Sequence, residues 1–154
     1  MNLPHWEHSN RFNVLLKKMM SMFNCKGAAL SLIDSRMQII KFQHGLGFDQ
    51  CSRQVSLDSH AILSPGYFLL LDASKDWRFK TNPIVKSLPN IKFYLGVPLI
   101  ASNKQVIGVL SIFDSFARCN NDESTVKIMK KMSSEIMEYL ETPIKKRNHD
   151  HRDG

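Results

Sequence analysis

The chain has little that would mark a membrane protein, a secreted scaffold or a metal protein. None of its apolar runs approaches the roughly 18 residues that a membrane-spanning helix needs, so no membrane insertion is expected. The first residues also lack the basic and apolar regions of a secretory signal. Cys25, Cys51 and Cys119 are far apart without Cys-x-x-Cys spacing, which argues against zinc and disulfides. We expect a cytoplasmic protein without a metal site.

The sequence also lacks a continuous basic stripe, although its formal net charge is +7. The densest basic cluster, Lys145 to Arg147, lies in a polar C-terminal segment, and other lysines fall on segments expected to be helical. Aromatic and basic residues do not interleave as they do on surfaces that stack nucleic-acid bases. Nucleic acid is therefore not expected as a partner.

The length and composition suit one folded domain. With 154 residues, 43% hydrophobic and 23% charged, the chain is long enough to bury one core. We assign residues 1–144 to this domain and residues 145–154 to a polar, flexible tail.

Two segments have the apolar spacing of helices that cover a core. The first runs from Ser9 to Asn24, with Ser9 or Asn10 as its expected cap, and the second begins after Asn121 or Asp122 and ends before Pro143. Their apolar residues recur at three- and four-residue steps: Phe12, Leu15, Leu16, Met19 and Phe23, and then Val126, Met129, Met132, Ile136 and Leu140.

Five short apolar segments between these helices are typical of strands. They are Ala28 to Ile33, Gln38 to Phe42, Tyr67 to Leu71, Phe93 to Ile100 and Val106 to Phe113. Short polar connections predict two hairpins, the second with Asn103 as its left-handed turn residue. Because strands and helices do not alternate, the order predicts an α+β fold with an antiparallel sheet and the terminal helices on one face.

The middle of the chain is rich in loops. The glycines Gly45 and Gly47 open a loop that runs to about Leu57, and one helical turn is expected from Asp58 to Leu63. A long connection from Asp72 to Asn90 contains aromatic residues and two prolines. In a compact domain, a structured loop of this length is more often functional than not.

Several short motifs in this chain resemble those of a known family. They are KDWRF from Lys75, NPIV from Asn82, LPNIKFYLGVPL from Leu88, SLID from Ser31, VSLDSHAIL from Val55, and the spaced residues Ile107, Gly108, Leu110, Ile112 and Asp114. Together they resemble the GAF domains of microbial sensor proteins and fungal signalling kinases. The resemblance extends from about Phe12 to about Leu140. It departs at Asp58, where many relatives have cysteine, at Lys92 and at Leu95.

The resemblance implies a central antiparallel sheet of five to six strands, with a small-molecule pocket between the sheet and the middle loops. Candidate ligand-binding residues come from the motifs, with an apolar wall of Trp77, Phe79 and Tyr94 and polar groups from His60, Asp76 and Arg78. A purely structural role is favoured over binding for them: the aromatic rings would close the core, Asp76 would pair with Arg78, and His60 would be a packed or solvent-facing histidine. No catalytic residue is assigned, and the resemblance leaves the cofactor unknown.

We therefore expect a non-catalytic sensory or regulatory domain of signal transduction. A metabolite would close the loop from Asp72 to Asn90 and shift the terminal helices toward a homodimer partner or an output domain. One alternative is a ligand-free dimerisation module, with Met20 or Ile128 in a helical seam.

A second alternative follows from another branch of the family, free methionine sulfoxide reductase. Cys51 lies in a loop comparable to the one that carries reactive thiols there. Asp58 stands where a second thiol might be expected, and a carboxylate does not attack a sulfoxide as a thiolate does. The sequence therefore disfavours catalysis.

Overall fold

The computed structural model describes residues 10–142. Its elements follow one another as α1 (Asn10–Phe23), β1 (Gly27–Ile33), β2 (Met37–His44), β3 (Gln50–Ser52), α2 (Asp58–Ala61), β4 (Phe68–Leu70), the 3₁₀ helix η2 (Ala73–Lys75), α3 (Pro83–Lys86), β5 (Phe93–Ile100), β6 (Val106–Asp114) and α4 (Glu123–Glu141). The predicted tail, residues 145–154, and the proposed cap at Ser9 lie outside the described residues.

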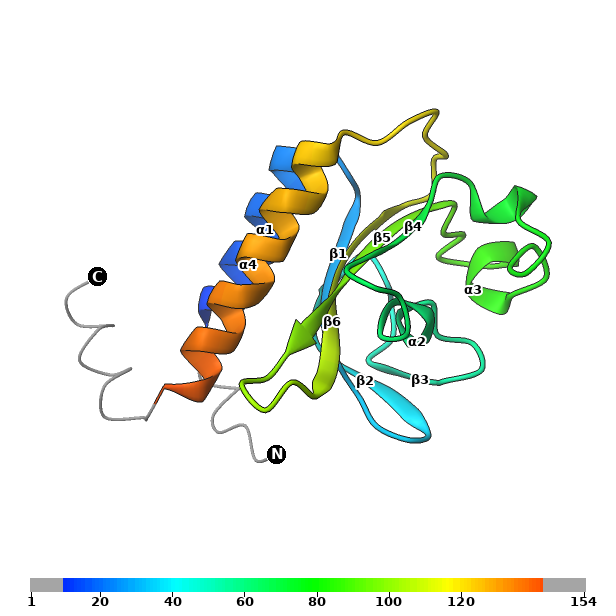
Figure 1. Cartoon of the computed structure of the whole chain (residues 1–154). Helices are drawn as coiled ribbons and strands as arrows, with labels where there is room; N and C mark the ends of the chain where they lie inside the picture. Colours follow the sequence, from blue (N-terminus) through cyan, green and yellow to red (C-terminus); the bar gives the residue numbers. More distant parts are fainter. Residues whose placement is uncertain (1–9, 143–154) are drawn as a thin grey trace.

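Six strands form one sheet in the order β3-β2-β1-β6-β5-β4, and every neighbouring pair is antiparallel. The two predicted hairpins are the pairs β1–β2 and β5–β6. Helices α1 and α4 lie together on one side of the sheet, while α2, α3 and the connecting segments lie on the other side (Figure 1). The predicted α+β fold, with the terminal helices on one face, is confirmed.

The sheet has a hydrophobic core on each side. We call the side under α1 and α4 the helix face and the opposite side the loop face. On β5, Phe93, Leu95 and Val97 belong to the core of the helix face, while Tyr94 belongs to the core of the loop face. Strand β5 therefore connects the two cores, because successive side chains point to opposite sides of a sheet.

The helix face is built from the two apolar stripes that the sequence predicts. Phe12, Leu16, Met19 and Phe23 are the buried residues of α1. Helix α4 begins at the predicted alternative Asp122, whose side chain accepts a hydrogen bond from the backbone amide of Ser124. None of the helices among residues 10–142 is both long and apolar enough to cross a membrane.

Three local expectations need correction. In the β5–β6 turn the left-handed residue is Lys104, with φ 72°, while Asn103 Oδ1 accepts a hydrogen bond from the Gln105 amide at 3.0 Å. Strand β3 was missed because three residues show no periodicity. Helix α3 was missed because it is one turn long, although Asn82 caps it and Pro83 begins it.

Candidate ligand-binding site

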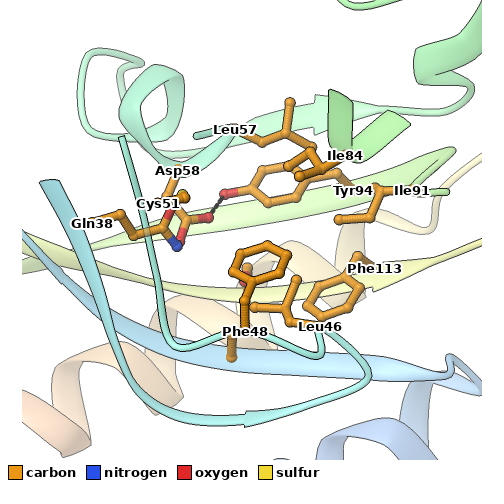
Figure 2. A pocket seen from close by; sticks show the side chains of 12 residues that line it. Gln38, Leu46, Phe48, Cys51, Leu57, Asp58, Ile84, Ile91, Tyr94 and Phe113 are labelled. Atoms are coloured by element: carbon orange, nitrogen blue, oxygen red, sulfur yellow. Dashed lines mark hydrogen bonds between the residues drawn. The ribbon is translucent and has the colours of Figure 1, made fainter. Parts of the chain in front are cut away.

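The loop face encloses a small cavity between the sheet and the middle loops (Figure 2). The volume available to the centre of a water molecule is about 20 Å³, which is room for about one ordered water. Its lining comes from most elements of the fold: Ala29, Gln38, Leu46, Phe48, Cys51, Leu57, Asp58, Ile84, Ile91, Tyr94, Ser111 and Phe113. The site is therefore assembled from segments that are distant in the sequence.

Most of the lining is apolar and much of it is aromatic. In Figure 2 the ring of Tyr94 lies above the rings of Phe48 and Phe113, and the leucine and isoleucine side chains complete the wall. Leu46 and Phe48 belong to the connection between β2 and β3, which crosses the cavity below Tyr94 (Figure 2). An apolar wall with few polar groups is the usual composition of a small-molecule site.

The polar end of the cavity is centred on Asp58, the first residue of α2. Only 3% of Asp58 is exposed. The hydroxyl of Tyr94 donates a hydrogen bond to Oδ1, and Nε2 of Gln38 donates to Oδ2 at 2.5 Å. The same Nε2 is 2.9 Å from Oγ of Ser31. Three strands thus supply neutral partners to one buried carboxyl group.

Gln38 links this carboxyl group to the thiol of Cys51. Its Oε1 accepts hydrogen bonds from the hydroxyl of Ser56 and from Sγ of Cys51, the latter at 3.2 Å. Gln38 is a polar residue in a buried position, so both ends of its amide group need hydrogen-bond partners. The surrounding side chains satisfy both ends.

Burial raises the pKa of Asp58 from 3.8 to about 6, and the hydrogen bonds from Tyr94, Ser31 and Gln38 partly oppose that rise. Burial also raises the pKa of Tyr94 well above its usual range, with the charge of Asp58 as a further cause. The pKa of Cys51 rises to about 11 because of burial and the same carboxylate. Near neutral pH, Asp58 is therefore the group of this cluster that changes charge, while the phenol and the thiol stay neutral.

The structure brings one of the six predicted site residues to the cavity, namely Tyr94. Phe79 is buried in the core of the loop face. The ring of His60 lies 4.8 Å from that of Phe79 and stacks on Phe68 at 5.6 Å, and burial and the charge of Arg78 lower the pKa of His60. His60 and Phe79 thus pack together outside the cavity lining.

The remaining three candidates lie at the surface. Arg78 Nη2 is 2.9 Å from Asp76 Oδ2, and the Asp76 carboxylate also accepts from the backbone amide of Arg78. The side chain of Trp77 is 80% exposed. In this structure the two charged groups of the DWRF motif therefore pair with each other and do not line the cavity, while its Phe79 is anchored in the core of the loop face.

Of the polar cluster only Tyr94 was among the predicted site residues, and its two central members, Asp58 and Gln38, were not. Gln38 lies on the same buried side of β2 as Ile40, so the strand pattern carries a signal: a polar residue in a buried position. Asp58 drew notice only as a replacement for cysteine. Among the described residues, no cluster of three or more His, Cys, Asp or Glu side chains is arranged to hold a metal ion.

Comparisons with known proteins agree with this architecture. The family model for the GAF domain matches residues 8–140. A curated relative, the cyclic di-GMP phosphodiesterase PA2567 of Pseudomonas aeruginosa, is 31% identical over 131 residues. The match covers 85% of this chain and 22% of that protein, so the chain spans about a fifth of the relative's length.

Two solved structures share the fold at low sequence identity. A domain of a two-component sensor histidine kinase protein from Sinorhizobium meliloti is similar with a TM-score of 0.64 and 13% identity, covering 94% of this chain and 99% of that chain. A type II free methionine-R-sulfoxide reductase from Thermoplasma acidophilum has a TM-score of 0.68 and 9% identity, with coverages of 83% and 88%. At such identities the likeness concerns the fold alone.

Proposed function

Because this chain belongs to the GAF domain family, we propose that it is a non-catalytic sensory domain of signal transduction, which binds a small metabolite in the cavity of the loop face. The observation that carries the proposal is the buried carboxyl group of Asp58 at one end of an apolar cavity. A buried ionisable group in a pocket is costly to keep unless it has a function.

The sheet supplies a route from this cavity to the terminal helices. Tyr94 faces the cavity, while its neighbours Phe93 and Leu95 belong to the core beneath α1 and α4. On the same strand, the carbonyl of Pro98 accepts a hydrogen bond from Ser133 of α4 at 2.7 Å. Because cores are close-packed, a ligand that displaces Tyr94 would also displace the strand on which α4 rests.

The chemistry of Cys51 supports a domain without catalysis. At neutral pH a pKa of about 11 keeps this thiol protonated, whereas the thiolate is the reactive form. Cys25 is buried and belongs to the core of the helix face, and Cys119 is exposed. The phosphodiesterase named above is about five times longer than the segment matched here, so its activity is not transferred to this chain.

A second function, dimerisation or contact with an output domain, is favoured by apolar residues on the terminal helices. Val14 and Met22 of α1 and Ile128 of α4 are exposed. Met20, the other residue considered for a helical seam, is partly buried against the core of the helix face. Sedimentation of the wild type and of Ile128→Lys tests this role, since a helical dimer should dissociate in the variant.

A cytoplasmic location completes the proposal, because a reducing compartment suits three free cysteines.

The ligand-binding proposal is tested by native mass spectrometry of the purified chain and by a thermal-shift screen of nucleotides, amino acids, amines and bilins. A true ligand should raise the melting temperature and slow hydrogen exchange both in the segment from Leu46 to Phe48 and in α4. If hydrogen exchange slows in the segment from Leu46 to Phe48 but not in α4, the ligand binds, but the result contradicts signalling through the terminal helices. Absence of any bound or stabilising compound would contradict the sensory role.

A further inference from the structure

The chemistry of the cavity also points to the class of ligand. Resting on the proposed function, we infer that the cavity takes a small, flat ligand whose ring carries a positively charged nitrogen group with N–H donors, such as an amidine, held by the carboxylate of Asp58. Anionic ligands, including phosphate esters and carboxylates, are excluded.

The first argument is the inventory of charge around the cavity. Its lining contains three ionisable side chains, Asp58, Cys51 and Tyr94, and no lysine, arginine or histidine. The thiol and the phenol are neutral near pH 7, because burial and the neighbouring carboxylate raise the pKa of both. The walls therefore carry one negative charge or none. An anionic ligand would meet no cation there.

The second argument is that Asp58 has hydrogen bonds but no counterion. Tyr94, Gln38 and Ser31 are all neutral, and no lysine, arginine or histidine of the described residues acts on its pKa. A charge in a low-dielectric environment gains most from an opposite charge brought into contact with it. A cationic N–H group that replaces or supplements the Tyr94 hydroxyl would supply both that charge and a stronger hydrogen bond.

The third argument is the shape of the wall beside this carboxylate. The rings of Phe48, Phe113 and Tyr94 frame the cavity next to Asp58 (Figure 2). Flat faces of this kind stack against a planar ring, and the face of an aromatic ring also attracts a cation. A flat cationic ligand satisfies both the walls and the polar end.

Entry of such a ligand requires a local rearrangement, because the cavity has room for about one water. The segment from Leu46 to Phe48 is suited to it. Gly45 precedes the segment and Gly47 lies within it, and their φ values are 92° and 81°. Gly45 packs closely against the backbone of Lys26, whereas the position of a Cβ on Gly47 has no neighbour within 4 Å, so Gly47 is the point at which the segment can move. Leu46 is fixed by one hydrogen bond, from its amide to Oε1 of Gln43 at 3.1 Å. Outward movement of Leu46 and Phe48 would make room beside Tyr94.

Three probes of nearly equal size and shape test the inference, namely benzamidine, which is cationic, benzamide, which is neutral, and benzoate, which is anionic. Each is titrated into the full chain near pH 7.5, and binding at the cavity is followed through the methyl resonances of Ala29, Leu57 and Ile84. Methyl signals locate the binding, which is necessary because a net charge of +7 attracts benzoate to the surface non-specifically. We expect benzamidine to bind at least about tenfold more tightly than benzamide, and benzoate not to enter.

Two matched variants assign the effect to one carboxylate. Asp58→Asn should lower the affinity for benzamidine about tenfold or more and leave the affinity for benzamide nearly unchanged. Asp76→Asn removes another aspartate, which pairs with Arg78 at the surface, and should change neither affinity. The affinity of wild type for benzamidine should also fall as the pH drops through about 6, where Asp58 takes up a proton, and this decline should be absent in Asp58→Asn. Cys51 and Tyr94, the other ionisable groups that face Asp58, do not titrate in that range.

The outcomes separate this inference from the proposed function. If benzoate or benzamide shifts the cavity methyl signals as strongly as benzamidine does, the cavity binds ligands but does not select a cation, and only the inference is wrong. The same conclusion holds if all three probes fail while the broader screen identifies an anionic or uncharged ligand. If neither the probes nor the screen yields a compound bound at the cavity, both the inference and the proposed function are wrong.

Discussion

The two faces of the sheet differ in what fills them and in what covers them. The core of the helix face consists of apolar residues under two helices of 14 and 19 residues. The loop face is covered by helices of three or four residues and by connections. It holds most of the buried polar side chains: Ser31, Gln38, Ser56, Asp58, Ser59 and Ser111.

This difference separates stability from recognition. Apolar burial under long helices is stabilising and shows little chemical selectivity. A buried carboxyl group with neutral partners is costly, and the short elements around it have less to keep them fixed. Strand β5 connects the two faces through alternate side chains, so a displacement of Tyr94 on the loop face would also displace Phe93 and Leu95 in the core of the helix face. Substitutions on the two faces should therefore differ in kind as well as in size.

The largest effect is expected on the helix face. Leu16 is 1% exposed in the middle of α1, and Leu16→Ala should lower the free energy of unfolding by about 3 to 4 kcal/mol. The matched change on the loop face is Leu46→Ala, which should cost about 2 kcal/mol, because a side chain that borders a cavity has fewer packing contacts to lose. Urea denaturation of both variants gives the comparison. Equal costs would mean that the two faces contribute equally to stability.

The second effect has the opposite sign. Asp58 has a pKa of about 6 when folded and near 3.8 when unfolded, so between these values the folded state holds more protons. Stability therefore decreases as the pH rises through this range, and the cost levels off above about pH 7, where Asp58 is ionised in both states. Asp58→Asn removes this cost and should stabilise the domain at pH 7 by about 1 to 3 kcal/mol.

Urea denaturation of Asp58→Asn and wild type at several pH values tests this sign. The advantage of the variant should shrink as the pH falls from 7 toward 3, because below 3.8 Asp58 is mostly protonated in both states. A variant that is less stable than wild type at pH 7 would show that the charged form of Asp58 contributes to folding. Asp76→Asn is the control at the surface, and should lower stability by less than about 1 kcal/mol.

A smaller effect is expected from removing one hydroxyl group of the same cluster. Tyr94→Phe keeps the ring but leaves Oδ1 of Asp58 without its donor, which should cost about 1 to 2 kcal/mol at pH 7. Because this hydrogen bond lowers the pKa of Asp58, the variant should titrate at a higher pH than wild type. Carbon NMR of the Asp58 carboxyl group measures the titration midpoint. A midpoint that stays unchanged or falls would contradict a hydrogen bond from Tyr94 to the charged form of Asp58.

The sequence predicted the helix face better than the loop face. The stripe of Phe12, Leu16, Met19 and Phe23 has a period that a helix alone explains, and the strands of the two hairpins are long apolar runs. Short elements gave no such period, so β3 and α3 were missed. The turn between β5 and β6 was predicted correctly, but its left-handed residue is Lys104 and not the predicted Asn103.

The candidate site was harder to predict because its polar groups meet only in three dimensions. Asp58, Gln38 and Tyr94 are far apart in the chain. Asp58 and Tyr94 lie in two different family motifs and Gln38 lies in none, so no single motif brings the three together. The motif DWRF was predicted to bind a ligand because it resembles a family motif. In the structure Asp76 and Arg78 bond to each other and do not line the cavity. A polar residue on the buried side of a strand, as at Gln38, was the available signal for the cavity.

The smallest effect is expected at Trp77, the aromatic residue of that motif. Since its side chain is 80% exposed, Trp77→Ala should change the free energy of unfolding by less than about 0.5 kcal/mol. Phe79, two residues later, is buried and serves as the contrast, because Phe79→Ala leaves a cavity in the core and should lower the free energy of unfolding several times more than Trp77→Ala does. Urea denaturation measures both changes.

Benzamidine titration of Trp77→Ala then decides whether the exposed ring takes part in binding. In the structure Trp77 is not among the residues that line the cavity, so the affinity should match that of wild type. A weaker affinity with unchanged stability would mean that the loop from Asp72 to Asn90 closes over the bound ligand and brings the indole ring to it. The loop face would then include a part that forms only on binding, while the helix face is complete without a ligand.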